Sequence, residues 1–460
     1  LPGSDQDVLE EQILKGSCAF VYAWDGHGYR FVTDVMWRSA LGMPVGIMGS
    51  GATAYAPAAA SREYLRIPGS RLVPRDGRYT LQFTEELWET AYLDEAKLLV
   101  VDHPDSVEVF VNERFVPPPP SPGPEDSLRL YQVVRRQPPR SALDAEGTDL
   151  LHALRTQDDV YVSNLTPGRY QGLTEPRDLL LDLGPLAGGG RTLLFLNGWI
   201  FPTDASINVA LSQARVAPVP IVPPFLQVRD ARGRWQTVIS DLGFPSGKNK
   251  TVIADLTGKF PTSDRQVRIR TNLHIYWDQV SVATLAPGSP VTITTVPPIA
   301  ADLHDRGFSK TFRKGGRYGP HWFDYDSVST EERWRAIDGG FTRFGDVLPL
   351  LGESDDRYII MGPGDETTVE FDASAAPALP RGWTRDFLIY TVGWIKDADL
   401  NTAQGATVEP LPFHGMTRYP YDGAEAYPAD SAHQRYLTTY NTRRTTSRLA
   451  GREVRKAAGR

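Results

Sequence analysis

Short runs of alternating apolar and polar residues, separated by turn-forming residues, fill most of this chain. Residues 18–24 are rich in strand formers, residues 25–28 read Asp-Gly-His-Gly, and residues 29–33 alternate again, which predicts a β-hairpin. Further runs of this kind lie at 79–83, 97–101 and 107–111. The pattern predicts a mainly β fold of tandem β-sandwich units, either jelly-roll or Ig-like, with few short helices.

Changes in composition divide the chain into segments. Residues 117–124 read Pro-Pro-Pro-Pro-Ser-Pro-Gly-Pro, which cannot pair in a sheet and predicts a stiff linker. A second β-rich stretch closes at the two prolines 297 and 298, and a short helix is predicted at 330–337 in a third stretch. The expected order is a lead segment at 1–17, a first sandwich-like domain at 18–116, a Pro-rich linker and connecting segment at 117–177, a second sandwich at 178–298, a third β-rich domain at 299–430 and a basic tail at 431–460.

An internal repeat joins the second and third β-rich stretches. In each copy Gly-Trp-Ile follows a strand-like run and precedes a short acidic segment. The copies are Gly198-Trp199-Ile200 with residues 204–208, and Gly393-Trp394-Ile395 with residues 397–401. We expect the two tryptophans to be buried at equivalent places in two related sandwiches.

Composition excludes several classes of protein. A net charge of −7 gives no general attraction to nucleic acid, and no apolar stretch is long enough for a transmembrane helix. One cysteine allows no internal disulfide, and the 8 histidines lack zinc-site spacing, so we expect no transition metal and no organic cofactor. Because the chain begins at Leu1 rather than Met, we expect it to be a processed product or a piece of a longer protein.

Several motifs resemble one family. They include Ala23-Trp24-Asp25-Gly26, Glu86-Leu87-Trp88-Glu89-Thr90, Gly198-Trp199-Ile200-Phe201-Pro202-Thr203-Asp204 and Leu411-Pro412-Phe413-His414-Gly415-Met416. The resemblance is to the region that follows the ASPIC/UnbV domain in large bacterial proteins with FG-GAP (CRTAC-like) repeats. It implies an extracytoplasmic location, in the periplasm or at the cell surface, and carries no catalytic residues over to this chain. No FG-GAP repeat with its Asp-rich calcium loop is visible here.

Calcium is the one cofactor that the sequence leaves open. Asp397, Asp399 and Asn401 have the opening spacing of a calcium loop, but Thr402 and Val408 stand where an EF-hand needs Gly and Glu. An EF-hand is therefore excluded. These three residues are candidate ligands of another kind of calcium site, and the alternative is that they cap turns.

The last 30 residues are basic. Residues 431–460 hold eight basic residues and one acid, Glu453. We expect the arginines to anchor this tail to an acidic surface of the body or of a partner subunit, by charged contacts rather than by a core of its own. On this reading a chain that ends at Asp430 still folds but loses its partner. The anchoring arginines are Arg443, Arg444, Arg448, Arg452 and Arg455.

Two classes of function remain. The first is a non-catalytic structural or protein-interaction module, part of a larger assembly with other subunits. The alternative is a protein that binds carbohydrate or acts on surface polysaccharide, using tryptophan faces and acids such as Glu86, Glu89 and Asp278. Tryptophans packed in the core favour the first class, and an open aromatic groove beside paired carboxylates favours the second.

Overall fold

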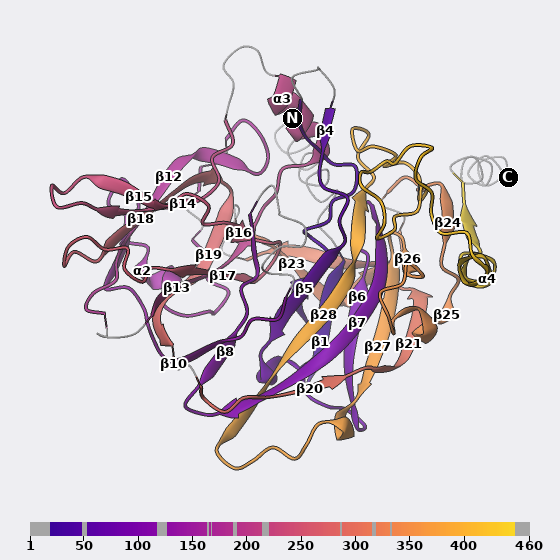
Figure 1. Cartoon of the computed structure of the whole chain (residues 1–460), viewed down its shortest axis with the longest axis horizontal. Helices are drawn as coiled ribbons and strands as arrows, with labels where there is room; N and C mark the ends of the chain where they lie inside the picture. The colour runs from indigo at the N-terminus through magenta and orange to yellow at the C-terminus, as the bar shows by residue number, and fades with distance from the viewer. Residues whose placement is uncertain are drawn as a thin grey trace.

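A computed structural model of the chain is mainly β, as predicted, and Figure 1 shows its strands in several antiparallel sheets. The structure describes residues 19–47, 53–116, 127–162, 165–166, 168–186, 191–213, 220–285, 288–314, 319–331 and 334–446. The predicted lead segment and the proline run at 117–124 therefore lie outside the described residues. Among the helices described, none has the length and apolar character needed to cross a membrane.

The strands of the larger sheets fall into four groups along the chain. The first group is β1 (Phe20–Trp24), β2 (Tyr29–Asp34), β5 (Ser61–Ile67), β6 (Arg78–Thr84) and β7 (Glu89–Pro104). The second is β8 (Glu108–Phe110), β10 (Tyr131–Gln137), β11 (Ser141–Leu143), β12 (Leu173–Asp182) and β13 (Thr192–Ile200). The third is β14 (Phe225–Arg229), β15 (Trp235–Ile239), β17 (Lys250–Asp255), β18 (Gln266–Leu273) and β19 (Ile275–Leu285). The fourth is β20 (Thr292–Val296), β21 (Pro298–Asp305), β25 (Gly345–Asp346), β26 (Ile359–Met361), β27 (Asp365–Asp372) and β28 (Trp383–Asp397).

Smaller elements connect these strands. The helices are α2 (Leu151–Leu154), α3 (Ala205–Gln213) and α4 (Ser431–Thr439). The remaining strands are β3 (Pro44–Ile47), β4 (Thr53–Tyr55), β9 (Arg114–Phe115), β16 (Phe244–Pro245), β22 (Phe308–Arg313), β23 (His321–Ser329), β24 (Gly339–Phe341) and β29 (Arg443–Thr445). The described part of the predicted helix at 330–337 is not helical, because this stretch runs as irregular chain between β23 and β24.

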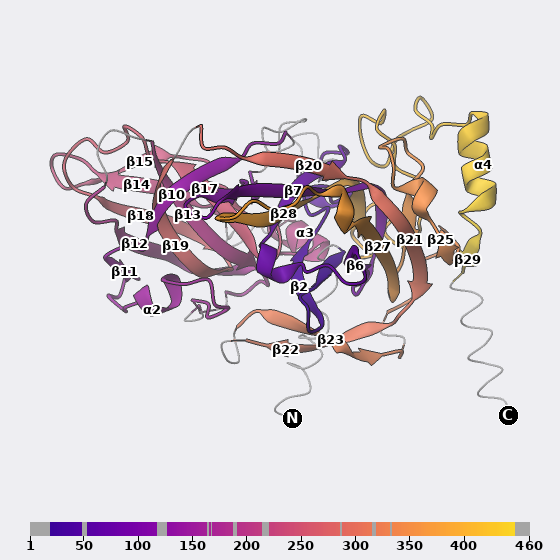
Figure 2. The same cartoon turned by 90° about the horizontal axis from the view of Figure 1, so that it is seen from below.

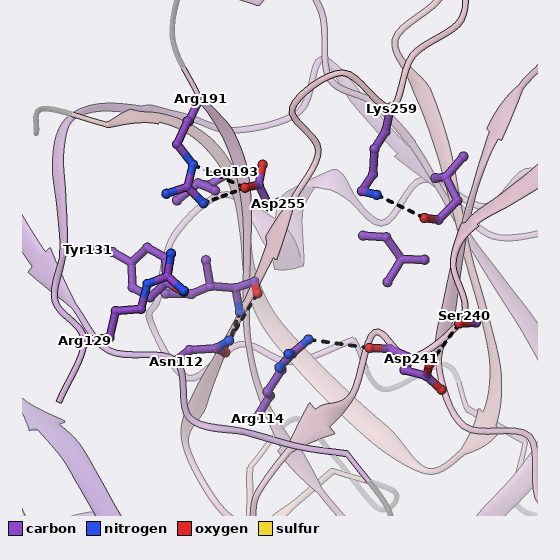
Figure 3. A pocket seen from close by; sticks show the side chains of 13 residues that line it. Asn112, Arg114, Arg129, Tyr131, Arg191, Leu193, Ser240, Asp241, Asp255 and Lys259 are labelled. Carbon is purple, nitrogen blue, oxygen red and sulfur yellow. Dashed lines mark hydrogen bonds and ion pairs between the residues drawn. The ribbon is translucent and has the colours of Figure 1, made fainter. Parts of the chain in front are cut away.

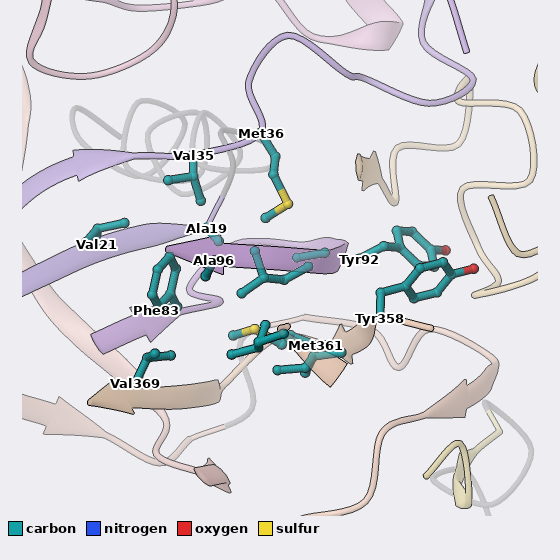
Figure 4. Packing of buried hydrophobic residues seen from close by; sticks show 14 of the residues in the cluster. Ala19, Val21, Val35, Met36, Phe83, Tyr92, Ala96, Tyr358, Met361 and Val369 are labelled. Carbon is teal, nitrogen blue, oxygen red and sulfur yellow. The ribbon is translucent and has the colours of Figure 1, made fainter. Parts of the chain in front are cut away.

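The first and fourth groups of strands build one sandwich, which we call unit I. One sheet has the order β2-β1-β6-β27-β21-β25 and the other the order β20-β7-β28-β5, with β26 also paired to β7. Side chains from both sheets meet in a single apolar core, among them Val21, Phe83, Tyr92 and Val369, which Figure 4 labels. Unit I is the part with indigo and orange strands interleaved in Figure 1.

The second and third groups build the other sandwich, unit II, coloured magenta in Figure 1. Its sheets have the orders β11-β12-β18-β14-β15 and β17-β13-β19-β10-β8, and a second apolar core lies between them. The expected succession of domains along the chain is therefore corrected. Segments 18–116 and 299–430 share the sheets of unit I, and unit II is inserted between them. Sequence patterns identify strands but not which distant strands pair, so they could not reveal this insertion.

Units I and II have the same strand order. The path β2-β1-β6-β27-β21 matches β15-β14-β18-β12-β11, and the path β20-β7-β28-β5 matches β10-β19-β13-β17. The first group of strands thus corresponds to the third, and the second group to the fourth. Unit I is a circularly permuted form of unit II, closed by pairing between the beginning and the end of the described chain.

The Gly-Trp-Ile repeat occupies the same place in both units. It lies on β13 and on β28, each a central strand with a β-bulge opposite the glycine. A Cβ on Gly198 would lie 2.7 Å from the carbonyl oxygen of Tyr276, and one on Gly393 would lie 2.2 Å from that of Tyr92. Trp199 and Trp394 follow and are both buried, as the repeat predicts. Glycine is required here because the bulged neighbour leaves no room for a side chain.

Each bulge places an aspartate at the same point. The strand register passes from Val392–Glu95 to Gly393–Leu93 in unit I and from Asn197–Gln279 to Gly198–Trp277 in unit II, so the extra residues are Asp94 and Asp278. Both aspartates are completely buried, and burial raises the pKa of each to about 7.

A neighbouring loop also matches between the two units. The backbone N–H of Asp356 donates to Asp94, that of Asp159 donates to Asp278, and both loop residues have a left-handed φ near +65° (65° and 64°). The sequence signals are Tyr-x-Asp at 92–94 and 276–278, and Asp-Asp-x-Tyr at 355–358 and 158–161. The two motifs are short and appear in opposite order in the two units, which makes them hard to detect without the fold.

Contacts between the units are polar as well as apolar. The completely buried Lys250 ammonium of unit II lies 3.1 Å from the carboxylate of Asp34 in unit I. The segments that follow the two Gly-Trp-Ile motifs touch, because Ser206 Oγ in α3 donates to Asp399 at 2.7 Å. The β22–β23 hairpin, at the lower edge of Figure 2, packs Trp322 against Phe31 of unit I and Trp199 of unit II.

Candidate functional site

A pocket of about 420 Å³ lies on unit II, at the edge where β17 and β15 approach each other (Figure 3). Its apolar lining comes from Tyr131, Leu193 and Ile253, which belong to a small cluster on the outer face of the β17-β13-β19-β10-β8 sheet. Residues 238–241, at and just after the end of β15, form another wall. Five separate stretches of chain therefore line the pocket, and no single sequence motif predicts it.

Cationic side chains outnumber acidic ones around this pocket. Arg114, Arg129, Arg191 and Lys259 line it, with Asp241 and Asp255. Arg191 pairs with the carboxylate of Asp255 at 2.5 Å. Lys259 donates to the carbonyl oxygen of Val238, and this neutral acceptor does not compensate the lysine charge. The exposed Arg129 lies over the Tyr131 ring with its guanidinium carbon 5.1 Å from the ring centre. The site thus combines an apolar floor with net positive charge, which suits an anionic ligand.

The edge of β17 beside the pocket is already capped by side chains. Asn112 accepts from the Ile253 N–H at 2.9 Å and donates to the Ile253 carbonyl oxygen, so it takes the place of a neighbouring strand. Glu113 binds the backbone N–H and carbonyl groups of Thr251 in a similar way. Its carboxylate accepts from the Thr251 N–H, and its own N–H donates to the Thr251 carbonyl oxygen. A partner at this pocket therefore meets side chains rather than a free strand edge.

The tail follows the expectation only in part. Arg443 donates to Asp365 and to the Thr342 carbonyl oxygen, and Arg444 lies 3.3 Å from Glu409, so both arginines contact the body. Tyr436 of α4 is buried in the core of unit I, and β29 pairs with β24. Residues 431–445 are thus part of unit I through core packing and strand pairing as well as charged contacts, whereas the sequence predicted a tail anchored mainly by its arginines. Arg448, Arg452 and Arg455 lie outside the described residues.

The candidate calcium ligands are engaged with the protein. Asp397 accepts from the Asp399 N–H at 2.8 Å, and Asp399 accepts from the Asn401 N–H at 2.8 Å and from Ser206 Oγ. These bonds agree with turn capping, the alternative reading of this segment. Within the described ranges, the one group of three or more His, Cys, Asp or Glu side chains close enough to share an ion is Asp94, Asp356 and His414. A calcium site at Asp397, Asp399 and Asn401 stays a prediction.

None of the described tryptophans presents a fully exposed face. Trp199, Trp277, Trp322 and Trp394 are buried, and the other described tryptophans are half-buried. Glu86, Glu89 and Asp278, the acids considered for glycoside hydrolysis, are buried as well. Glu86 accepts hydrogen bonds from Tyr22, Ser309 and Arg306, a role in the packing of the β22–β23 hairpin. None of these three acids faces solvent.

The buried Glu85, which lies next to Glu89, makes the stability of the protein depend on pH. Burial, and then the neighbouring Glu89, raise the pKa of Glu85 well above its usual value, so folding favours the protonated acid. Its stabilising contribution is complete below a pH of about 4.5, the unfolded value, and is lost as pH rises through the higher folded value. We expect Glu85→Gln to stabilise the protein at pH 8 by about 1–3 kcal/mol and to flatten its pH profile.

Thermal denaturation from pH 5 to pH 8 checks this expectation, with the exposed Glu353→Gln as the control. A Glu85→Gln protein less stable than the wild type at pH 8 would show that this carboxyl group is ionised and bound in the fold.

No protein-family model, curated protein or solved structure matches this chain. The geometry of the two units and of the pocket is therefore the basis for assigning a function.

Proposed function

We propose that this chain is a non-catalytic interaction module of an extracytoplasmic assembly, and that unit II binds an acidic segment of a protein partner. The observation that carries the proposal is the pocket of Figure 3, where four cationic and two acidic side chains surround an apolar floor. A net positive charge around such a floor favours a partner with acidic and apolar side chains in sequence. The extracytoplasmic location rests on the resemblance of the motifs to the region after the ASPIC/UnbV domain.

The alternative, a carbohydrate-binding or polysaccharide-acting protein, has less support. Sugar-binding sites present flat aromatic faces to solvent, whereas the described tryptophans are all either buried or half-buried. The acids that a hydrolase would use, Glu86, Glu89 and Asp278, are all buried. Glu86 accepts a hydrogen bond from the Ser309 N–H, and burial raises the pKa of Asp278 to about 7. Both observations favour binding of a protein segment without catalysis.

Titration with a defined acidic probe tests the proposal. A fluorescent peptide of about 12 residues, rich in Asp and Glu with one Leu and one Tyr, is added to the intact protein and its anisotropy is followed. We expect saturable binding that weakens at least tenfold between about 0.05 M and 0.3 M NaCl, because salt screens charges at an open site.

Alginate, an acidic polysaccharide, serves as the competing probe. Displacement of the peptide only at much higher carboxylate concentrations of alginate supports the protein-binding function. Absence of saturable peptide binding, or tight binding of alginate alone, would refute it, and the second result would favour the carbohydrate alternative.

A further inference from the structure

Three ionisable side chains converge at the bulge of unit I. Asp94 comes from β7, Asp356 from the loop before β26, and His414 from the loop that follows β28. One potential ligand atom from each lies within 4.8 Å of the other two. Nδ1 of His414 is 2.6 Å from Asp356 Oδ1 and 3.8 Å from Asp94 Oδ2. Residues 262 and 58 positions apart in the sequence thus meet at one point.

Asp94 has capacity for a further partner. Its side chain is completely buried, and its Oδ1 atom accepts no hydrogen bond from the described residues. The other oxygen, Oδ2, accepts two long bonds of 3.3 Å, from Ser354 Oγ and from the Asp356 N–H. A buried carboxylate with an unpartnered oxygen is costly unless a cation or a proton compensates it.

The histidine is held in the orientation of a metal ligand. Its Nε2 atom lies 3.0 Å from Ser354 Oγ, and its ring packs against Trp394 with the ring centres 4.8 Å apart. Ligating histidines commonly use one ring nitrogen for the metal while a neighbouring polar group fixes the other. Here Nδ1 faces the two carboxylates, and the side chain is a quarter exposed, at 25%, so an ion has access from solvent.

Unit II provides a comparison within the same chain. Its equivalent loop residue, Asp159, is 2.7 Å from the ammonium group of Lys314. A cationic side chain of the β22–β23 hairpin therefore compensates this carboxylate of unit II. Unit I has an imidazole at the corresponding carboxylate, which can bind a cation as a neutral ligand.

From this geometry we propose that Asp94, Asp356 and His414 form a binding site for a divalent transition metal of the Zn²⁺ class in unit I. Two carboxylate oxygens and one imidazole nitrogen are a ligand set that Zn²⁺ accepts, with solvent at the remaining position. The 3.8 Å between Nδ1 and Asp94 Oδ2 is close to the ~3.4 Å between ligand atoms around a tetrahedral ion with bonds of ~2.1 Å. The ion would replace the short contact between His414 and Asp356. The inference is independent of the proposed function.

An ion at this point would join the C-terminal segment to the core. The carbonyl oxygen of Asp356 accepts from the Tyr427 hydroxyl, and that of Asp355 lies 3.1 Å from Nε2 of His433 in α4. The site therefore binds together β7, the loop before β26 and the segment that leads into the tail. We expect Zn²⁺ to raise the melting temperature of the intact protein, and EDTA to reverse the rise.

Calorimetric titration of the tag-free, chelator-treated full chain with ZnCl₂ tests the site. We expect one ion to bind per chain, with Asp94→Asn weakening the affinity at least tenfold. The sharper variant is His414→Lys, which places an ammonium group beside Asp356, as Lys314 does beside Asp159. It should abolish binding and make the melting temperature insensitive to Zn²⁺ while the protein stays folded, as judged by circular dichroism.

Asp278→Asn, the matching change in unit II, is the control and should leave Zn²⁺ affinity unchanged. Failure of the wild-type chain to bind one Zn²⁺ would overturn the proposal, and His414 would then serve only as a partner of Asp356. Undiminished binding by a folded His414→Lys protein would also overturn it, because the ion would then lie elsewhere.

Discussion

Replacing Gly393 by alanine is expected to destabilise the protein by about 3 kcal/mol or more. The new Cβ would lie 2.2 Å from the Tyr92 carbonyl oxygen and 2.6 Å from the Met36 sulfur. The first of these atoms belongs to the backbone of β7, the central neighbour of β28, so it cannot move without breaking the bulge. We expect Gly198→Ala to destabilise in the same direction, because its Cβ would meet the Tyr276 carbonyl oxygen and the Trp277 ring, both at 2.7 Å.

Chemical denaturation of the purified variants measures these effects. Gly423→Ala is the matched control, since a Cβ there has no neighbour within 4 Å. A Gly393→Ala protein as stable as the control would contradict the bulged packing of the Gly-Trp-Ile motif.

Removal of residues 431–460 is expected to destabilise unit I strongly instead of leaving it intact. The deletion removes Tyr436, which is buried in the core and donates from its hydroxyl to the Tyr358 carbonyl oxygen at 2.7 Å. Truncation of a buried aromatic side chain alone costs about 3–5 kcal/mol. The deletion also removes Arg443, which lowers the pKa of the buried Asp365 against the upward effect of burial.

The melting temperature of a chain ending at Asp430 checks this prediction, and a chain ending at Thr446, which keeps α4 and β29, is the control. We expect a loss of cooperative unfolding or a fall of at least 10 °C for the shorter chain only. Equal stability of the two chains would contradict this prediction and show that the body folds without the tail, as the sequence predicts.

Local patterns predicted local structure well. The hairpin at 18–33 forms as β1 and β2 because Asp25 accepts from the backbone N–H groups of His27 and Gly28, a bond pattern encoded within four residues. The Gly-Trp-Ile repeat predicted two related sandwiches with buried tryptophans for a similar reason. Each motif carries its own steric requirement, the missing Cβ at Gly198 and Gly393.

The sequence could not predict which distant strands pair with each other. Strands β7 and β28 pair along fifteen residues of β28, although nearly 300 residues separate the two strands in the sequence. Neither strand has a sequence pattern that predicts which other strand it pairs with. The same limit applies to both sites. The pocket on unit II draws on five stretches of chain, and Asp94, Asp356 and His414 lack any common spacing. Histidine spacing could not reveal that the fold brings these three potential ligands together.

The affinity of pocket variants for the acidic peptide tests the central claim most directly. Arg129→Glu combined with Lys259→Glu reverses two charges at the pocket rim, and the exposed Arg381→Glu changes charge on the loop before β28 in unit I. We predict that the double variant loses at least tenfold in affinity at about 0.1 M salt while the control stays within twofold of the wild type. Equal affinities of the double variant and the control would contradict binding at this pocket.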